Sequence, residues 1–196
     1  RGGRAERGSG AQAEAPEEAV AKRMAYFEQS QRILLPVSVA YMTFTVVLAL
    51  LFNLLPWHDL TGVPDMAALV IAFWCVHQPR RMGIGAAWFV GLIMDAGNST
   101  LMGQHAFAYA FLAFGALTLH RRILWFSLWR QAAHVLVLLL ASEALMLGVR
   151  MIAGGVFPGL MYFAGSLTAA ALWPTATFLL LLPQRRPESV DENRPL

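Results

Sequence analysis

The chain has 196 residues, of which 57% are hydrophobic and 14% charged. This composition is too apolar for an ordinary soluble domain. Only ten of its 27 charged residues lie between Ile33 and Leu182, and the rest crowd into the two ends. A long apolar middle with charged ends is typical of an integral membrane protein. The net charge of +3 comes from short basic pairs rather than a continuous basic stripe, so it does not indicate nucleic-acid binding.

The two ends of the chain are predicted to be cytoplasmic tails that flank one membrane domain over residues 32–184. Residues 1–31 are rich in Gly, Ala, Glu and Arg and show little apolar periodicity, which predicts a disordered tail. Met24 is a candidate natural start, in which case the residues before it are not native. Residues 185–196 form the second tail.

Six apolar runs follow in chain order, and we expect each to be a membrane-spanning helix in an all-α bundle. They cover residues 33–55, 64–76, 82–94, 101–119, 131–152 and 157–182. The first run is about 34 Å long as a helix, which is enough to cross a bilayer. The second and third are each only about 20 Å long. They form either one broken hairpin that dips into the membrane or two short spans, and their depth stays open.

The basic residues predict the orientation. With the N-terminus inside, only Arg150, near a membrane boundary, falls on the outer side. The cytoplasmic side receives Lys22, Arg23, Arg32, Arg80, Arg81, Arg121, Arg122, Arg130, Arg185 and Arg186. The outer loops at residues 57–63, 96–100 and 153–156 contain no Lys or Arg. This positive-inside bias supports six spans, because a five-span arrangement would place a basic pair outside.

The connector at residues 120–131 mixes basic and apolar side chains. Trp125 and Trp129 fall at predicted membrane boundaries here, as Trp57 does after the first run. The connector is interpreted as a segment lying on anionic headgroups, with a partner-docking segment as the alternative.

Asp95 follows the third run at the predicted outer surface. There its carboxylate costs little desolvation, and it can cap the next helix or hold the turn at residues 96–100. Ion handling and a partner contact are the alternatives. Asp65 also lies at the outer end of a run and is a possible neighbour, but no motif supports an aspartyl catalytic pair.

Glu143 lies near the middle of the fifth run, where a carboxylate is costly and therefore suggests a functional site. An interior hydrogen bond, a protein–protein contact and a transport site are all open, and Arg150 is a candidate partner because it lies two turns further along the same face. His105, His120 and His134 lack metal-ligand spacing, and the chain has no P-loop or nucleotide-binding fingerprint. Ser99 belongs to a weak G-x-S in a predicted surface turn, which does not support a protease. We therefore expect no catalytic, metal or cofactor site, and a buried structural thiol at Cys75.

Several short motifs in fixed order resemble the rod shape-determining protein MreD family. The motifs are Pro64-Asp65 at the start of the second run, Trp74 near its end, Pro79 with its basic flank, Gly91-Leu92, Asp95, Leu101 with Gly103, His105-Ala106, and the later "FPG" and "LWP". Each motif alone is weak, but their order is fairly specific. The resemblance covers residues from about 33 to the end of the chain.

The resemblance implies a non-enzymatic inner-membrane subunit of the bacterial elongation machinery. Its implied partners are MreC, the actin-like MreB, the glycosyltransferase RodA with its class B transpeptidase, and membrane lipids. The implied fold is similar to the substrate-binding membrane subunit of energy-coupling-factor transporters. That similarity leaves a second hypothesis, a transporter subunit that binds a small molecule or lipid near Glu143. The candidate partner-binding or structural residues are Asp65, Gly91, Asp95, Gly103, His105 and Glu143.

Overall fold

The computed structural model describes residues 38–56, 62–98 and 101–184, and these form helices and connectors without a strand. The helices are α2 (Val39–Asn53), α3 (Met66–His77), α4 (Ile84–Gly97), α5 (Gln104–Leu124), α6 (Leu128–Ile152), α7 (Ala164–Ala171) and α8 (Trp173–Leu181), with 3-10 turns η1 (Leu160–Phe163) and η2 (Leu182–Gln184). Contacts separate a bundle, Val37–Leu181, from a second unit of which only η2 is described. The predicted tails and Trp57 lie outside the described residues.

Each of the six predicted apolar runs contains at least one helix in its described part. The second and third runs form two separate helices. Helix α3 ends at His77, because Pro79 lacks the N–H group needed to continue it. The sixth run is split into α7 and α8 at Leu172, and Pro174 sits in the first turn of α8, as expected for a helix interrupted near a proline.

Among the described helices, α6 alone has the length and hydropathy to cross a membrane by itself, with 25 residues. The α7–α8 pair qualifies only as one bent span, and α2, α3 and α4 are shorter apolar helices. Six crossings therefore remain a prediction, while the all-helical fold is confirmed.

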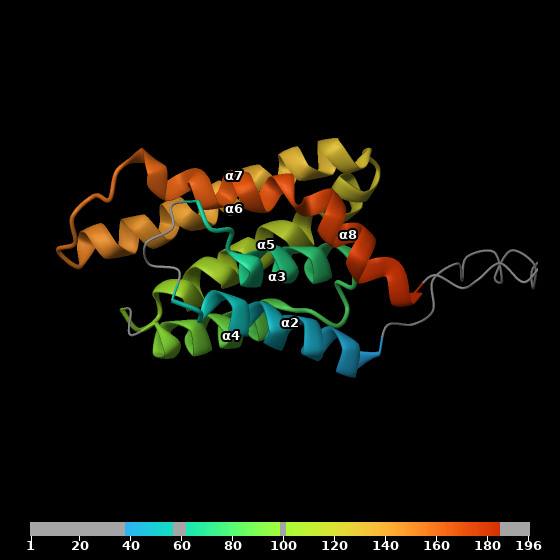
Figure 1. Cartoon of the computed structure of the whole chain (residues 1–196), viewed down its shortest axis with the longest axis horizontal. Coiled ribbons are helices and arrows are strands. Elements are labelled where there is room, and N and C mark those ends of the chain that lie inside the picture. The colour runs from blue at the N-terminus through green and yellow to red at the C-terminus, as the bar shows by residue number, and fades with distance from the viewer. Residues whose placement is uncertain (1–37, 57–61, 99–100, 185–196) are drawn as a thin grey trace, which may run out of the picture. The chain divides into compact units, whose positions relative to one another are not determined.

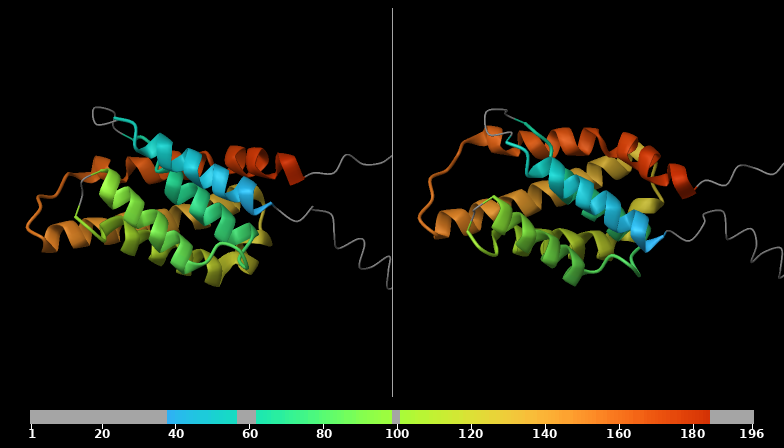
Figure 2. Two further views of the ribbon diagram at one scale, coloured as in Figure 1. Left: turned by 90° about the horizontal axis from the view of Figure 1, so that it is seen from below. Right: turned by 60° about the horizontal axis from the view of Figure 1, so that its bottom comes forward.

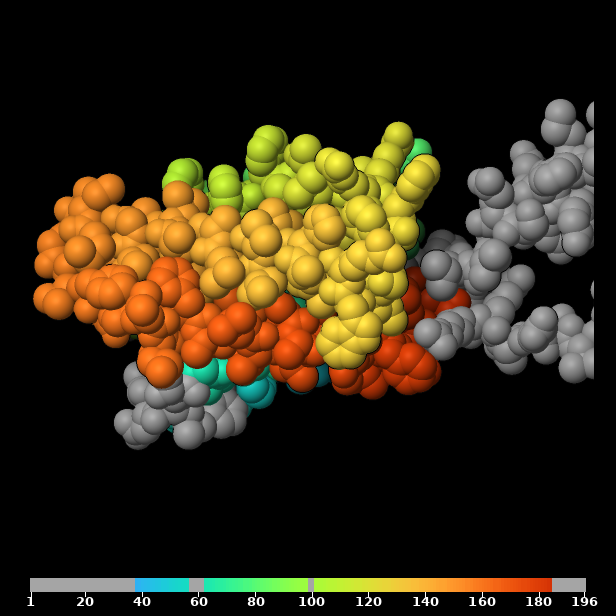
Figure 3. Space-filling view, turned by 90° about the horizontal axis from the view of Figure 1, so that it is seen from above, coloured from blue at the N-terminus to red at the C-terminus, as the bar shows by residue number. Residues whose placement is uncertain are grey.

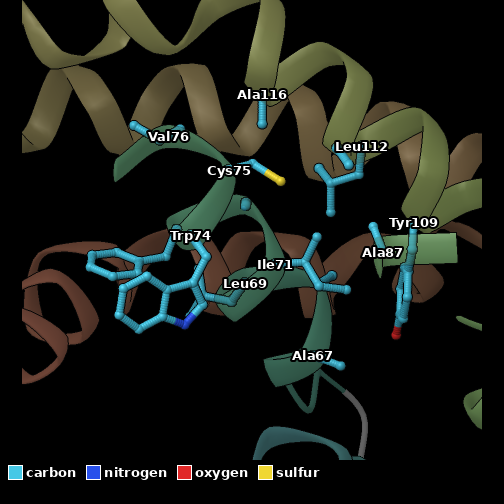
Figure 4. Close-up of a cluster of buried hydrophobic side chains, with 14 of the residues drawn as sticks. Ala67, Leu69, Ile71, Trp74, Cys75, Val76, Ala87, Tyr109, Leu112 and Ala116 are labelled. Atoms are coloured by element: carbon cyan, nitrogen blue, oxygen red, sulfur yellow. The ribbon is translucent and has the colours of Figure 1, made fainter. Parts of the chain in front are cut away.

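Helix α3 is the centre of the bundle. Every residue from Ala67 to Val76 except Val70 is buried, and a helix that is apolar on all sides requires such a position. Its side chains pack against α5, as Figure 4 shows for Ile71 and Cys75 beside Leu112 and Ala116. The Trp74 indole N–H donates to the Thr45 hydroxyl of α2 at 2.9 Å. Cys75 is free and buried, as predicted.

The outer face of the bundle is apolar. Large hydrophobic side chains are exposed along α2, α4 and α5, among them Phe44, Leu48, Leu51, Trp88, Phe89, Phe107, Phe111 and Phe114. Such an extensive apolar surface is typical of a protein surrounded by lipid or by other membrane helices.

The connectors at the two ends of the bundle differ in character. The connectors from α3 to α4 and from α5 to α6 lie at one end, together with the start of α2 and the end of α8 (Figures 1 and 2). Arg80 and Arg81 lie in the first connector, and Arg121, Arg122 and Arg130 flank the second. The end of α2, the start of α3, the end of α4 and the start of α5 meet at the opposite end.

On another face α6 runs beside α7 and α8 (Figure 3).

Candidate functional site

Asp95 holds the first turn of α5. Its Oδ1 accepts hydrogen bonds from the backbone N–H of His105 at 2.9 Å and from its ring Nδ1 at 2.8 Å. Its Oδ2 accepts from the N–H groups of Gly103, at 2.9 Å, and Ala106, at 3.2 Å. These N–H groups have no partner inside the helix, and a carboxylate suits the positive end of the helix dipole. The prediction that Asp95 caps the next helix is confirmed.

The predicted exposure of Asp95 was wrong, because the residue is only 1% exposed. The cause is a close contact between α4 and α5. A Cβ atom on Gly91 would lie 2.4 Å from the Cα of Ala106, so only glycine allows the two backbones to approach this closely. Gly103 begins α5 with a φ of +96°, a conformation that glycine adopts at little cost. Both glycines therefore have structural roles at this site.

Asp65 plays a matching part at the start of α3. Its Oδ1 accepts from the Ala68 N–H at 2.8 Å and from the Asn53 side-chain amide at 2.6 Å. The Tyr109 hydroxyl of α5 donates to Asp65, 2.9 Å from Oδ2. Asn53 in turn accepts from the Met66 N–H at 3.0 Å. The carboxylate therefore joins the ends of α2 and α3 to the side of α5.

The two aspartates belong to one group. His105 and Tyr109 lie one helical turn apart on α5, with ring centroids 5.9 Å apart in an edge-on arrangement. We call Asn53, Asp65, Asp95, His105 and Tyr109 the polar cluster. Asp65, Asp95 and His105 were candidate residues in the sequence, whereas Asn53 and Tyr109 were not predicted. The available signals were a polar residue at the end of the first run and a tyrosine four residues after His105.

Glu143 is also buried, at 9% exposure, but its surroundings are different. Its Oε2 atom has no hydrogen-bond partner among the described residues. Ser166 on α7 lies beside Glu143 and interacts with its carboxyl group through its hydroxyl and its backbone N–H, although the Ser166 hydroxyl makes no hydrogen bond of good geometry among the described residues. The suggested ion pair with Arg150 is not formed in the described structure.

Glu143 lines a cleft with a volume of about 620 Å³. Asn53, Asp65 and His105 of the polar cluster contribute to one part of the wall. Apolar and aromatic side chains complete it, including Met94, Met146, Met161, Pro158 and Tyr162. Cavities of 300–1,000 Å³ with a few polar groups in an apolar wall are typical of small-molecule sites.

Part of the cleft wall is fixed by a close contact between the segment before α3 and the helix α7. The Thr168 hydroxyl donates to the Gly62 carbonyl at 2.8 Å. A Cβ on Gly165 would lie 2.8 Å from the Val63 carbonyl oxygen and 3.4 Å from Oε1 of Glu143. Glycine at this position therefore lets the segment and Glu143 approach α7 together.

The described residues contain no group of three or more His, Cys, Asp or Glu side chains that could hold a metal ion. Asp65 and Asp95 are engaged by helix-end donors, which leaves Glu143 as the buried carboxylate with free hydrogen-bonding capacity. Ser99 lies outside the described residues.

The apolar outer face, the long helix α6 and the buried polar groups at one end of the bundle define an all-α membrane protein. No solved structure matches the chain. The sequence model of the family described as rod shape-determining protein MreD matches residues 31–184. The chain belongs to the MreD family, as its ordered motifs predicted.

Proposed function

We propose that this protein is a non-enzymatic subunit of the bacterial elongation complex in the inner membrane. In this role it binds MreC and helps to organise peptidoglycan synthesis and cell shape, together with MreB, RodA and the class B transpeptidase. Membership of a rod shape-determining family supports the general role. The choice of MreC as the direct partner is our inference.

The observation that carries the binding role is an apolar tip beyond the polar cluster. We use the name "tip" for residues 152–161, which run from the last residue of α6 to the second residue of η1. Ile152, Val156, Leu160 and Met161 are each more than 70% exposed. Met102 is 74% exposed in the turn that precedes α5. Apolar side chains on connectors, where water or headgroups are near, fit a docking surface for another membrane protein.

The polar cluster supports this role indirectly. It connects four helix ends through hydrogen bonds that are partly shielded from solvent, so the turns beside the tip are held in one arrangement. A rigid surface loses less conformational entropy on binding than a flexible one. The expected contribution of Asp95 to assembly is therefore to position the turn at residues 101–103, and not to touch the partner.

The proposed topology has six spans and both termini in the cytoplasm. It is supported by the arginine-bearing connectors, which share one end of the bundle with the start of α2 and the end of α8. The short helix α3 then crosses within the centre of the bundle, whereas the short helix α4 crosses with one face packed on α5 and the other exposed. Accessibility labelling of single cysteines introduced at Arg81 and Val156 tests this arrangement, and labelling of both from the same side contradicts it.

The binding role is tested by purifying the tagged full-length chain from its native cells in mild detergent and identifying co-purified proteins by mass spectrometry. We expect MreC and the wall-synthesis enzymes. Leu160→Ser should lower MreC recovery, whereas Val39→Ser, an exposed position at the other end of the bundle, should not. Asp95→Ala should weaken assembly without abolishing insertion. Recovery of an ATPase and its membrane coupling subunit without wall enzymes would refute the proposal.

A further inference from the structure

We infer that the cleft beside Glu143 binds a small ligand through a positively charged ammonium or guanidinium group. This inference goes beyond the proposed scaffold role and does not depend on MreC. It follows from the contrast between the hydrogen bonding of the polar cluster and that of Glu143.

One oxygen of the Glu143 carboxyl group is buried without a hydrogen-bond partner in the described part of the chain. Glu143 is more than nine-tenths buried, and its Oε2 has no partner among the described residues. An unsatisfied buried polar atom costs about 1–3 kcal/mol, and more when it is charged. Native structures leave few such atoms, and each requires an explanation such as a missing ligand.

The cleft beside Glu143 is large enough for a small ligand. Glu143 lines a cleft of about 620 Å³, whereas Asp95, which is fully hydrogen-bonded, does not. Three methionines and two prolines also line the cleft, so part of its wall is apolar and adaptable. A cleft of this size accommodates a ligand of drug-like dimensions with one charged end.

The charged residues that line the cleft indicate the charge of the ligand. Asp65 and Glu143 are both acidic and both line the cleft, and no Lys or Arg is among the lining residues. Asn53 and Tyr162 add polar atoms near the carboxylates. A ligand with a positive group would be attracted by both carboxylates, and charge-assisted hydrogen bonds to a carboxylate are roughly twice as strong as neutral ones. An anionic ligand would be repelled.

Two sources can supply such a group. One is a free amine or guanidine from the aqueous side, and the other is the ethanolamine headgroup of a phospholipid. The same carboxylate would recognise both, so the chemistry is shared and the experiment separates the sources.

The test uses the full-length chain in detergent with agmatine, which carries one ammonium and one guanidinium group, as the soluble probe. We expect wild type to bind agmatine by calorimetry and Glu143→Gln to bind at least tenfold more weakly. Ser142→Ala is the matched control, since Ser142 is buried on the same helix, donates to the Leu139 carbonyl and does not line the cleft. It should bind as wild type does.

A second variant controls for misfolding. Met146 lies on the same side of α6, three residues after Glu143, and lines the cleft. Met146→Lys places an ammonium group beside Glu143, so it should abolish agmatine binding; because Met146 is only 5% exposed, some loss of melting temperature is expected, and an unchanged helical circular dichroism spectrum shows that the variant is folded. Wild-type agmatine affinity in Met146→Lys or in Glu143→Gln would overturn the inference.

The lipid arm uses nanodiscs with equal amounts of phosphatidylethanolamine and phosphatidylglycerol, followed by native mass spectrometry. Preferential retention of phosphatidylethanolamine that is lost in Glu143→Gln would identify the headgroup as the source. Glu143-dependent binding of agmatine without lipid retention would identify a soluble ligand. Absence of Glu143-dependent binding in both arms would refute the inference.

Discussion

Asp95 and Glu143 are both carboxylates buried in the same helical bundle, and they differ in what surrounds them. The oxygens of Asp95 accept four hydrogen bonds from the first turn of α5 and the His105 ring. Glu143 lines a cleft, and its Oε2 has no hydrogen-bond partner in the described part of the chain. A buried carboxylate stabilises a fold only when donors are buried with it. The comparison therefore assigns Asp95 to the architecture and leaves Glu143 available for binding.

The largest expected effect comes from Gly91→Ala, which would separate the helices that bury Asp95. The new Cβ would lie 2.4 Å from the Ala106 Cα, a backbone atom that cannot move alone. We expect a loss of about 3 kcal/mol in unfolding free energy, at the upper end for overpacking. Thermal unfolding in detergent measures it. Gly85→Ala in the same helix meets no atom within 4 Å and should be neutral or slightly stabilising. Equal melting temperatures for the two variants would contradict the close approach.

Asp95→Ala should cost slightly less, roughly 2–3 kcal/mol, because it removes a helix cap and leaves buried N–H groups without acceptors. Asp95→Asn keeps one acceptor oxygen and should fall between alanine and wild type. Denaturant titration of the purified chain reports the order. If the two variants were equally stable, the charge and second oxygen of Asp95 would contribute nothing.

Tyr109→Phe tests the link between the two halves of the polar cluster. It removes a hydroxyl that donates to Asp65, while Asp65 keeps its bonds to Asn53 and to the N–H of Ala68. The expected loss is about 1–2 kcal/mol, typical of a hydrogen bond to a charged group. Tyr162→Phe is the matched control and should change the melting temperature little. A similar loss in both variants would indicate a general effect of losing a hydroxyl.

The smallest expected effect is that of Glu143→Gln on the ligand-free chain. Because Oε2 has no donor to lose among the described residues and glutamine keeps one acceptor oxygen for Ser166, the unfolding free energy should stay within about 0.5 kcal/mol of wild type or rise. The same measurement as for Asp95→Asn gives a direct comparison of two isosteric changes. A loss as large as that of Asp95→Asn would show that Glu143 is also structural, and would remove the contrast.

The sequence predicted the helical class, the apolar runs and the capping role of Asp95, because these depend on local composition and on the ends of individual runs. Cys75 was also predicted correctly, since a lone thiol within an apolar run is expected to be buried. The burial of Asp95 was missed, because it depends on how closely α4 approaches α5. Asn53 and Tyr109 were missed for the same reason: their partner, Asp65, is 12 and 44 residues away.

The amino-acid sequence by itself determined that this protein is an apolar helical chain with its charges at run ends, and its ordered motifs indicated the family. Only the tertiary structure decided which carboxylate is satisfied. Asp95 ends an apolar run and Glu143 lies within one, but neither position shows which hydrogen-bond donors are buried beside the carboxylate. The difference arises because the N–H groups at the start of α5 reach both oxygens of Asp95, whereas Oε2 of Glu143, beside the cleft, has no hydrogen-bond partner among the described residues.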